Sequence, residues 1–275
     1  MGNDSPAFPL SMLSQSSLQD YSDCPRRFQL RYLQRLAWPA VESEPALENE
    51  RRQQEGLLFH RLVHQHLLGL PAEKVGRLAS GPNLSRWWEH YLADAHLQRL
   101  RSGAILYPEV TLSAPLGGVR LLAQYDLIAR QERALLIYDW KTYRHRPRNE
   151  WLAARWQTRL YRALLVQAGA SLLEGAAPEA EQIEMVYWFA DYPNEPARFA
   201  YSTAQFQRDW SALQTLVAEI LSASDFPKTD DERDCLYCVY RSYCERGVAA
   251  GEGEGSEAEG PAWDFDFEQI QEIVF

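Results

Sequence analysis

Three strand-like segments in the middle of the chain constrain the fold more than any other feature of the sequence. Residues 105–113, 119–129 and 134–140 combine apolar, β-branched and aromatic side chains in the manner of strands. The Pro-Leu-Gly-Gly run at 115–118 and the polar residues 130–133 separate them, and both connections are short enough for hairpin turns. The sequence therefore predicts a meander of three neighbouring strands.

Helical patterns lie on both sides of this meander. Apolar residues recur at helical spacing in residues 15–36, 47–69 and 84–100 before it, and in residues 150–168 and 203–222 after it. A strand near 182–190 and a short one at 197–201 lie between the last two helices. Since 46% of the 275 residues are apolar, the chain can bury a core. We expect an α/β fold with one central mixed sheet flanked by helices.

Composition divides the chain into three parts. Residues 1–13 form an N-terminal arm, residues 14–248 a single domain, and residues 249–275 an acidic segment that begins with a flexible Gly, Glu and Ala-rich linker. This last segment carries eight acids and no Lys or Arg. We expect it to bind a partner or to shield a basic channel, with a plain solubilising tail as the alternative.

The sequence indicates a cytoplasmic protein without membrane contact. It has no run of about 18 uncharged apolar residues, the length that a membrane-spanning helix needs. Its first ten residues lack the basic start and the apolar stretch of a secretory signal.

The net charge of −10 is unevenly distributed, because residues 1–248 contain 28 basic and 30 acidic side chains. Of the basic residues, 25 are Arg and 3 are Lys, which suits phosphate binding, although a GC-rich genome produces the same bias. Two groups stand out, one of Arg26, Arg27, Arg31 and Arg35 and one of Arg144, Arg146, Arg148, Arg155, Arg159 and Arg162. Tyr143, Trp151 and Trp156 accompany the second group, either as a nucleic-acid channel or as core residues.

Two acids and an amine lie in the second and third predicted strands. Asp126 lies within the second strand, and Asp139, Trp140 and Lys141 end the third. Because strand side chains alternate, Asp139 and Lys141 share one face, and the short connection makes the Asp126 strand their neighbour. Such carboxylates suit Mg²⁺ or Mn²⁺. The alternative is an ordinary exposed ion pair at a strand end.

Two weaker motifs lie on the predicted helices. Gly56 precedes His60 by four residues, so that another backbone can approach closely and His60 can become a metal ligand. Gln157 and Tyr161 place an amide and a phenol one helical turn apart, suited to orient phosphate or water. Taken singly, each pattern is a weak signal, and the alternative for His60 is a hydrogen-bonded structural histidine.

The cysteines have a one-plus-three distribution. Cys24 lies near the start, and Cys235, Cys238 and Cys244 lie together near the end of the domain. In a cytosolic chain this pattern favours a metal centre over disulfides. Spacing alone leaves a structural zinc site and an iron–sulfur cluster both open. Either would join the N- and C-terminal parts of the domain.

Taken in order, these motifs resemble the RecB-like branch of the PD-(D/E)XK nuclease superfamily. The matching run begins at Ser16 and passes through the Gly56, Asp126, Asp139 and Gln157 motifs to Cys244, so it covers about residues 14–246. Within that branch the sequence is most similar to iron–sulfur exonucleases such as the AddB nuclease domain and the CRISPR-associated RecB-like nucleases. Two positions depart from the usual pattern, namely Ala123 in place of Gly and the bulky Trp140.

The resemblance implies a restriction-endonuclease-like core and DNA cleavage with Mg²⁺ or Mn²⁺. It implies that His60, Asp126, Asp139 and the Trp140 main-chain carbonyl hold the metal, that Lys141 positions or activates water, and that Gln157 and Tyr161 contact the DNA backbone. It also implies a [4Fe–4S] cluster on Cys24, Cys235, Cys238 and Cys244. Relatives often carry an acid in the first strand, where this chain has Glu109.

We therefore expect a DNA exonuclease that prefers single strands or ends and acts in recombination, repair or CRISPR adaptation. The sequence lacks the phosphate-binding GxxxxGK[ST] motif of helicases, so a partner would supply any unwinding. One alternative is a non-catalytic DNA-end-binding subunit of a helicase–nuclease assembly, and another is a zinc-stabilised interaction protein.

Overall fold

A mixed β-sheet forms the centre of the molecule, which a computed structural model describes for residues 10–36, 44–236 and 238–247. Its strands are β1 (Met12–Ser14), β2 (Ile105–Leu116), β3 (Val119–Gln131), β4 (Ala134–Lys141), β5 (Ile183–Phe189) and β6 (Tyr192–Ala200). β2, β3 and β4 pair in antiparallel fashion, β4 and β5 are parallel, and β5 and β6 are antiparallel. The predicted meander and mixed sheet are confirmed.

Two tight turns close the meander. Gly117 and Gly118 connect β2 to β3 with φ angles of 59° and 98°, a left-handed conformation that glycine adopts without strain. Glu132 has a φ of 52° in the second turn, between β3 and β4. The short β1 pairs in parallel with Arg120 to Leu122 of β3. Residues 12 and 13 of the predicted N-terminal arm therefore belong to the sheet.

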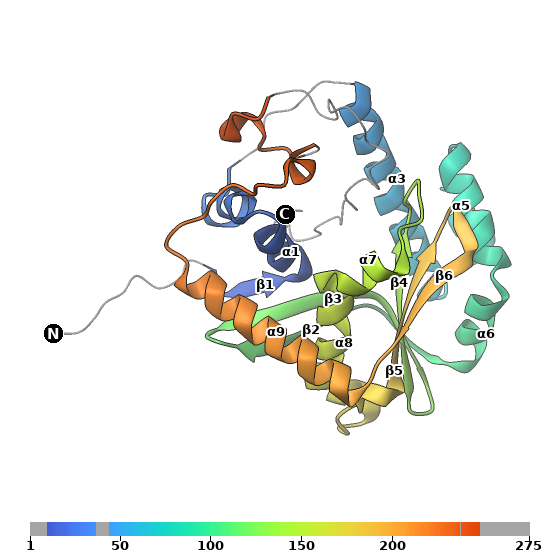
Figure 1. The fold of residues 1–275 in the computed structure, drawn as a ribbon. Coiled ribbons are helices and arrows are strands. Elements are labelled where there is room, and N and C mark those ends of the chain that lie inside the picture. Colours follow the sequence, from blue (N-terminus) through green and yellow to red (C-terminus); the bar gives the residue numbers. More distant parts are fainter. Residues whose placement is uncertain (1–9, 37–43, 237, 248–275) are drawn as a thin grey trace, which may run out of the picture.

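Helices cover both faces of this sheet (Figure 1). On one face pack α1 (Gln15–Asp23), α8 (Trp156–Ala168) and α9 (Thr203–Ser222). On the other face pack α3 (Glu44–Leu67), α5 (Pro82–Ala93) and α6 (Ala95–Gly103). Each face has its own apolar cluster, so the sheet is buried on both sides.

The alternation along β4 decides where its charged residues lie. Leu135 and Ile137 belong to the core on the α8 face, whereas Leu136, Tyr138 and Trp140 belong to the core on the α3 face. Successive side chains of a strand point to opposite faces. Asp139 and Lys141 consequently lie together on the α8 face, and the prediction was that they share one face.

Three predicted helices are each interrupted. Cys24 is extended before Pro25, because a residue that precedes proline disfavours the helical conformation, so α1 is followed by α2 (Pro25–Phe28) and a π-helical turn (Gln29–Leu33). Asp94 ends α5 and caps α6 by accepting hydrogen bonds from two main-chain N–H groups. Arg155 separates α7 (Asn149–Ala154) from α8. The prediction of single helices over 15–36, 84–100 and 150–168 was wrong at these breaks.

Shorter elements complete the fold. They are α4 (Ala72–Gly76) and 3₁₀ turns at Gly169–Leu173, Ala180–Gln182, Glu232–Cys235 and Ser242–Cys244. Strands β2 and β6 are longer than predicted. None of the helices within the described ranges has the length and apolar character to cross a membrane. The acidic segment 249–275 lies outside the described residues.

Candidate active site

Asp126 lies where the regular pairing of β3 is interrupted. β3 pairs with β4 from Gln131 to Leu127 only, and the next residue along, Asp126, accepts a hydrogen bond on Oδ2 from the Trp140 main-chain N–H at 2.7 Å. On its other side, Glu109 of β2 stands opposite Asp126 with a φ of 51° and is left out of the ladder. The pairing of β3 with both of its neighbours, β2 and β4, is thus interrupted at a buried carboxylate.

The side-chain alternation also changes phase at this point. Tyr125 of β3 belongs to the core on the α8 face, but Leu127 belongs to the core on the α3 face, although two residues separate them. In an unbroken strand both would face the same way. The irregularity lets Asp126 reach β4 and α3 instead of staying in an ordinary strand position.

Asp139, Lys141 and Gln157 form a closed set of contacts on the α8 face. Lys141 Nζ lies 2.9 Å from Asp139 Oδ2 and donates to Gln157 Oε1 at 2.9 Å, while Gln157 Nε2 donates to Asp139 Oδ1 at 2.7 Å. All three residues are buried. Tyr187 of β5 adds a hydroxyl that donates to Gln157 Oε1 at 3.3 Å. Sequence patterns gave no sign of Tyr187, which is one of several aromatics in its strand.

Helix α3 brings His60 to the other side of Asp126. His60 Nδ1 lies 3.2 Å from Asp126 Oδ1. The close approach predicted for Gly56 is present, because a Cβ at this position would lie 2.8 Å from Thr142 Oγ1, just beyond the end of β4. The neighbour is a side chain, not the backbone that the sequence led us to expect.

Arg52, one turn before Gly56, was not identified from the sequence. Its guanidinium donates through Nε to the Thr142 carbonyl at 2.8 Å and through Nη2 to Asp191 at 2.5 Å. It also lies over the Trp87 ring at 5.2 Å. The spacing of four residues between Arg52, Gly56 and His60, one face of a helix, was the available signal.

Electrostatics keep Asp126 charged. Burial would raise its pKa, but His60, the Trp140 N–H and Lys141 hold the pKa of Asp126 below its ordinary value. Burial would lower the pKa of His60, but the Asp126 carboxylate raises it. Burial and the charge of Asp126 together raise the pKa of Glu109 to about 7. A cation bound here would compete with a proton for His60, because an imidazole ligates a metal in its neutral form.

Trp140 and Tyr161, the other predicted site residues, are largely buried. The Trp140 ring packs against Tyr91 and Trp188 on the α3 face, which accounts for a bulky residue between Asp139 and Lys141. Tyr161 packs in the core on the α8 face, 4.7 Å from the Tyr125 ring centroid, and its carbonyl accepts from the Tyr125 hydroxyl. The metal-binding role of the Trp140 carbonyl and the DNA contact of Tyr161 stay predictions.

The donor set suits a hard divalent cation, since Asp126, Asp139 and His60 offer oxygen and nitrogen ligands near a fixed cationic amine. Among the described residues, however, no three His, Cys, Asp or Glu side chains are grouped as a ready ligand shell. Asp126 is engaged by His60 and Trp140, and Asp139 by Lys141 and Gln157. These contacts would have to rearrange around an ion.

The four cysteines form no disulfide, and they line one small cavity between the N-terminal helices and the C-terminal end of the domain. Cys24 is buried, and the other three are partly buried. Arg27, Arg241 and Arg246 line the same cavity, and Arg246 Nη1 lies 3.1 Å from Cys235 Sγ. Burial raises the pKa of Cys238 to about 11. The lining thus combines four sulfur donors with arginines, but among the described residues no three of these thiols are grouped closely enough to form a ready ligand shell.

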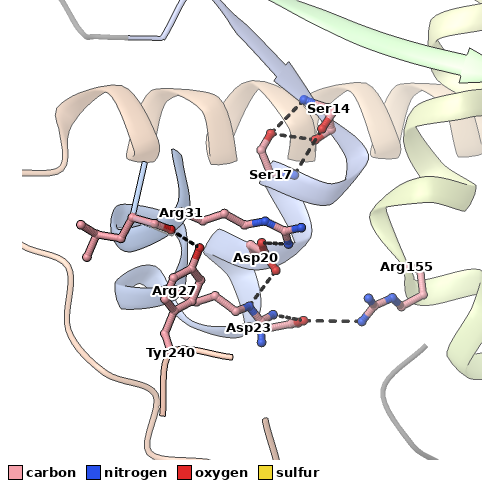
Figure 2. Close-up of polar contacts among 9 residues, drawn as sticks. Ser14, Ser17, Asp20, Asp23, Arg27, Arg31, Arg155 and Tyr240 are labelled. Atoms are coloured by element: carbon pink, nitrogen blue, oxygen red, sulfur yellow. Dashed lines mark hydrogen bonds and ion pairs between the residues drawn. The ribbon is translucent and has the colours of Figure 1, made fainter. Parts of the chain in front are cut away.

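Many of the predicted phosphate-binding arginines are engaged within the protein. Arg27 and Arg31 both pair with Asp20 (Figure 2), and Arg159 pairs with the buried Asp209 at 3.0 Å. Arg159 also lies over the Trp156 ring at 4.2 Å, and Arg155 over the Trp151 ring at 4.7 Å. Both tryptophans pack against the core at their inner side. A role in DNA binding stays a prediction for this region.

Comparisons with known proteins address the family and the fold of this chain. The model of the PD-(D/E)XK nuclease superfamily matches residues 12–245. A search of curated proteins finds no match. A solved structure of a candidate exonuclease from Eubacterium rectale is 10% identical, covers 80% of this chain and 85% of its own, and has a TM-score of 0.51, which shows a shared fold. The structure of SSO0001 is 14% identical over 87% of this chain and 88% of its own, with a TM-score of 0.42, too low to establish a shared fold.

Proposed function

Because this chain belongs to the PD-(D/E)XK nuclease superfamily, we propose that it is a metal-dependent DNA exonuclease of the RecB-like branch. The observation that carries this proposal is that two contacting sets of buried side chains lie where β3 and β4 separate: Asp126 with His60, and Asp139 with Lys141 and Gln157. Binding DNA alone gives no reason for this costly burial of charges.

The family resemblance implies the roles that we propose. His60, Asp126, Asp139 and the Trp140 carbonyl would hold Mg²⁺ or Mn²⁺, which neutralises phosphate charge and lowers the pKa of a water molecule. Lys141 is kept in place by Asp139 and Gln157, so its ammonium can orient the attacking water and stabilise the negative charge that develops on the phosphate. Gln157 holds the amine and the carboxylate at a fixed separation.

A cleavage assay tests this function. Labelled single-stranded and double-stranded DNA are incubated with the protein and Mg²⁺ or Mn²⁺, beside Asp126→Ala, Asp139→Ala and Lys141→Ala. We expect each substitution to lower the rate on the order of 10³-fold. Asp230→Asn, at an exposed acid, is the matched control. Cleavage that survives any of the three changes would reject the assigned site.

The same assay addresses the finer features of the proposal. We expect faster cleavage of single strands or ends than of closed duplexes. A wild-type chain that binds DNA ends but leaves them intact would favour the non-catalytic end-binding subunit. The cellular pathway, recombination and repair or CRISPR adaptation, is then tested by the phenotype of a strain that lacks the protein.

For the cysteines we propose a [4Fe–4S] cluster held by Cys24, Cys235, Cys238 and Cys244, with structural zinc as the alternative. The shared cavity and its arginines support an anionic metal centre. Protein purified without oxygen should be brown, with broad visible absorption and about four irons per chain. Colourless protein with one zinc would overturn the cluster, and a metal-free protein would overturn both.

Residues 249–275 are proposed to bind a helicase or another partner, or to occupy a basic channel in place of DNA. A chain shortened at 248 should show a changed DNA affinity or lose a partner. If both stay unchanged, the segment is a solubilising tail.

A further inference from the structure

Gln157 occupies the second position of α8, at a point where the helix starts abruptly. Arg155 is extended immediately before it and provides no side-chain cap. The first N–H groups of a helix lack partners within the helix, and helix ends fray when these groups are left to water. The place of Gln157 between Asp139 and Lys141 therefore depends on what holds the first turn of α8.

Helix α1 provides the missing cap from elsewhere in the chain. Gln19 Oε1 accepts a hydrogen bond from the Trp156 main-chain N–H at 3.1 Å. Ser22 Oγ accepts from the Trp156 indole N–H at 2.7 Å. The first residue of α8 is thus bonded to α1 through both its main chain and its side chain.

Asp23 fixes the Gln19 side chain in turn. Gln19 Nε2 donates to Asp23 Oδ1 at 2.7 Å, and Asp23 Oδ2 lies 2.9 Å from Arg27 and 3.6 Å from Arg155 (Figure 2). Because the amide nitrogen faces Asp23, its oxygen faces the Trp156 N–H. A contact within α1 therefore orients the Gln19 amide independently of α8.

We propose that Gln19 is a positioning residue of the active site, which fixes the start of α8 and so holds Gln157 between Asp139 and Lys141. This inference rests on the proposed nuclease function. Gln19 contacts neither Asp139 nor Lys141, so its effect on cleavage passes through Gln157. Loss of its cap would change the rate of the bound complex and leave DNA binding alone.

The test uses the full chain with Gln19→Met, which keeps the length of the side chain and removes both hydrogen bonds. We expect kcat on single-stranded DNA with Mn²⁺ to fall about tenfold, while KM stays within about twofold. Gln29→Met is the matched control, because Gln29 is also half-buried in the N-terminal region but bonds Arg26 rather than α8. It should leave kcat unchanged.

A double-mutant cycle separates positioning from a general loss of structure. In a Gln157→Met background, Gln19→Met should lower kcat no further. A second tenfold fall there would overturn the proposal, as would an unchanged kcat for Gln19→Met alone. Ser22→Ala is a milder change at an exposed residue, and it replaces Gln19→Met in the test if that variant does not fold. It should lower kcat when Gln157 is present and leave kcat unchanged in the Gln157→Met background.

Hydrogen exchange at the Trp156 amide gives a readout that does not need cleavage. We expect Gln19→Met to speed exchange of this amide and Gln29→Met to leave it unchanged. Equal protection in wild type and Gln19→Met would overturn the cap. A wild-type chain that shows the cap but does not cut DNA would overturn the proposed function instead, so the two failures are distinguishable.

Discussion

The Asp126 carboxylate and the Trp140 main-chain N–H are joined by a hydrogen bond of 2.7 Å. The bond lies one residue beyond the last regular pair of β3 and β4, which is Leu127 with Tyr138. The Asp126 side chain thus accepts a hydrogen bond that a main-chain carbonyl accepts elsewhere in the paired strands. Asp126 therefore supports the separation of the strands as well as offering a charge to the site.

This dual role predicts that Asp126→Ala and Asp126→Asn differ in stability. Alanine leaves the buried Trp140 N–H without its acceptor, whereas asparagine keeps an oxygen in place. We expect the alanine variant to be less stable than the asparagine variant by about 1–3 kcal/mol, measured by urea unfolding in a chelator. Both should be inactive on DNA. Equal free energies of unfolding would mean that the strands stay apart without this bond.

Gly56 should tolerate no side chain. A Cβ would meet Thr142 Oγ1 at 2.8 Å and push α3, with His60, away from Asp126. We expect Gly56→Ala to cost about 1–3 kcal/mol and to slow cleavage on the order of tenfold or more.

Gly103→Ala is the matched control, because it also lies in a helix but has open space around it. It should be neutral or slightly stabilising. Adding Thr142→Ala to Gly56→Ala should restore most of the lost stability and rate. No recovery in this pair would show that the close approach is not what selects glycine.

His66 should make stability depend on pH. Burial lowers its pKa to about 4, and the ring sits beside Tyr91, whose hydroxyl is 3.2 Å from Nδ1. Between about pH 6.5 and pH 4 the unfolded chain binds a proton there and the folded chain does not. Stability from this group is complete above about pH 6.5 and falls as the pH drops through that window.

Urea unfolding of His66→Gln and wild type from pH 7 to pH 4.5, with a chelator present, checks this dependence. The variant should lose less stability on acidification, by an amount on the order of 2 kcal/mol. His145→Gln, at an exposed histidine, should follow the wild-type curve. Parallel curves for His66→Gln and wild type would contradict the assignment.

Stability should depend far more on Asp20 than on Asp231, a less buried acid in a similar pair. Asp20 is buried and receives Arg27 at 2.7 Å and Arg31 at 2.9 Å, whereas Asp231 and Arg233 pair on the surface. We expect Asp20→Asn to cost about 2–3 kcal/mol, because two arginines lose their countercharge. Asp231→Asn should cost less, because Asp231 is only half-buried and its replacement weakens one surface pair and the cap of one short turn. Similar midpoints for the two variants would remove Asp20 as an anchor of the N-terminal helices.

Local patterns predicted the sheet and the common face of Asp139 and Lys141. Alternation along one strand was enough to put Asp139 and Lys141 on one face, and two glycines identified the turn that places β2 beside β3. Pro25 and Asp94 are residue types that indicate two of the helix breaks. The apolar periodicity continues across both positions, however, and it favoured a single helix in each case.

The rest depended on contacts between distant segments. Nothing in the local sequence of Glu109 and Asp126 marks the shared interruption of β2 and β3, because each residue alone fits an ordinary strand. Tyr187 reaches Gln157 from a strand 30 residues away, and Arg52 reaches Thr142 across 90. Such relations follow from the packing of α3 and α8 on the sheet and not from spacing along the chain.

The Tyr240 hydroxyl donates to the Leu36 carbonyl across 204 residues, beside the cavity that Leu30 and the four cysteines line. During translation the proposed catalytic side chains leave the ribosome before Cys235 does. A premature stop before Cys235 would therefore yield a polypeptide that keeps every one of them but exposes Leu30, which the complete protein buries. Such a fragment would offer proteases and chaperones an apolar end, so quality control would favour finished copies over truncated ones.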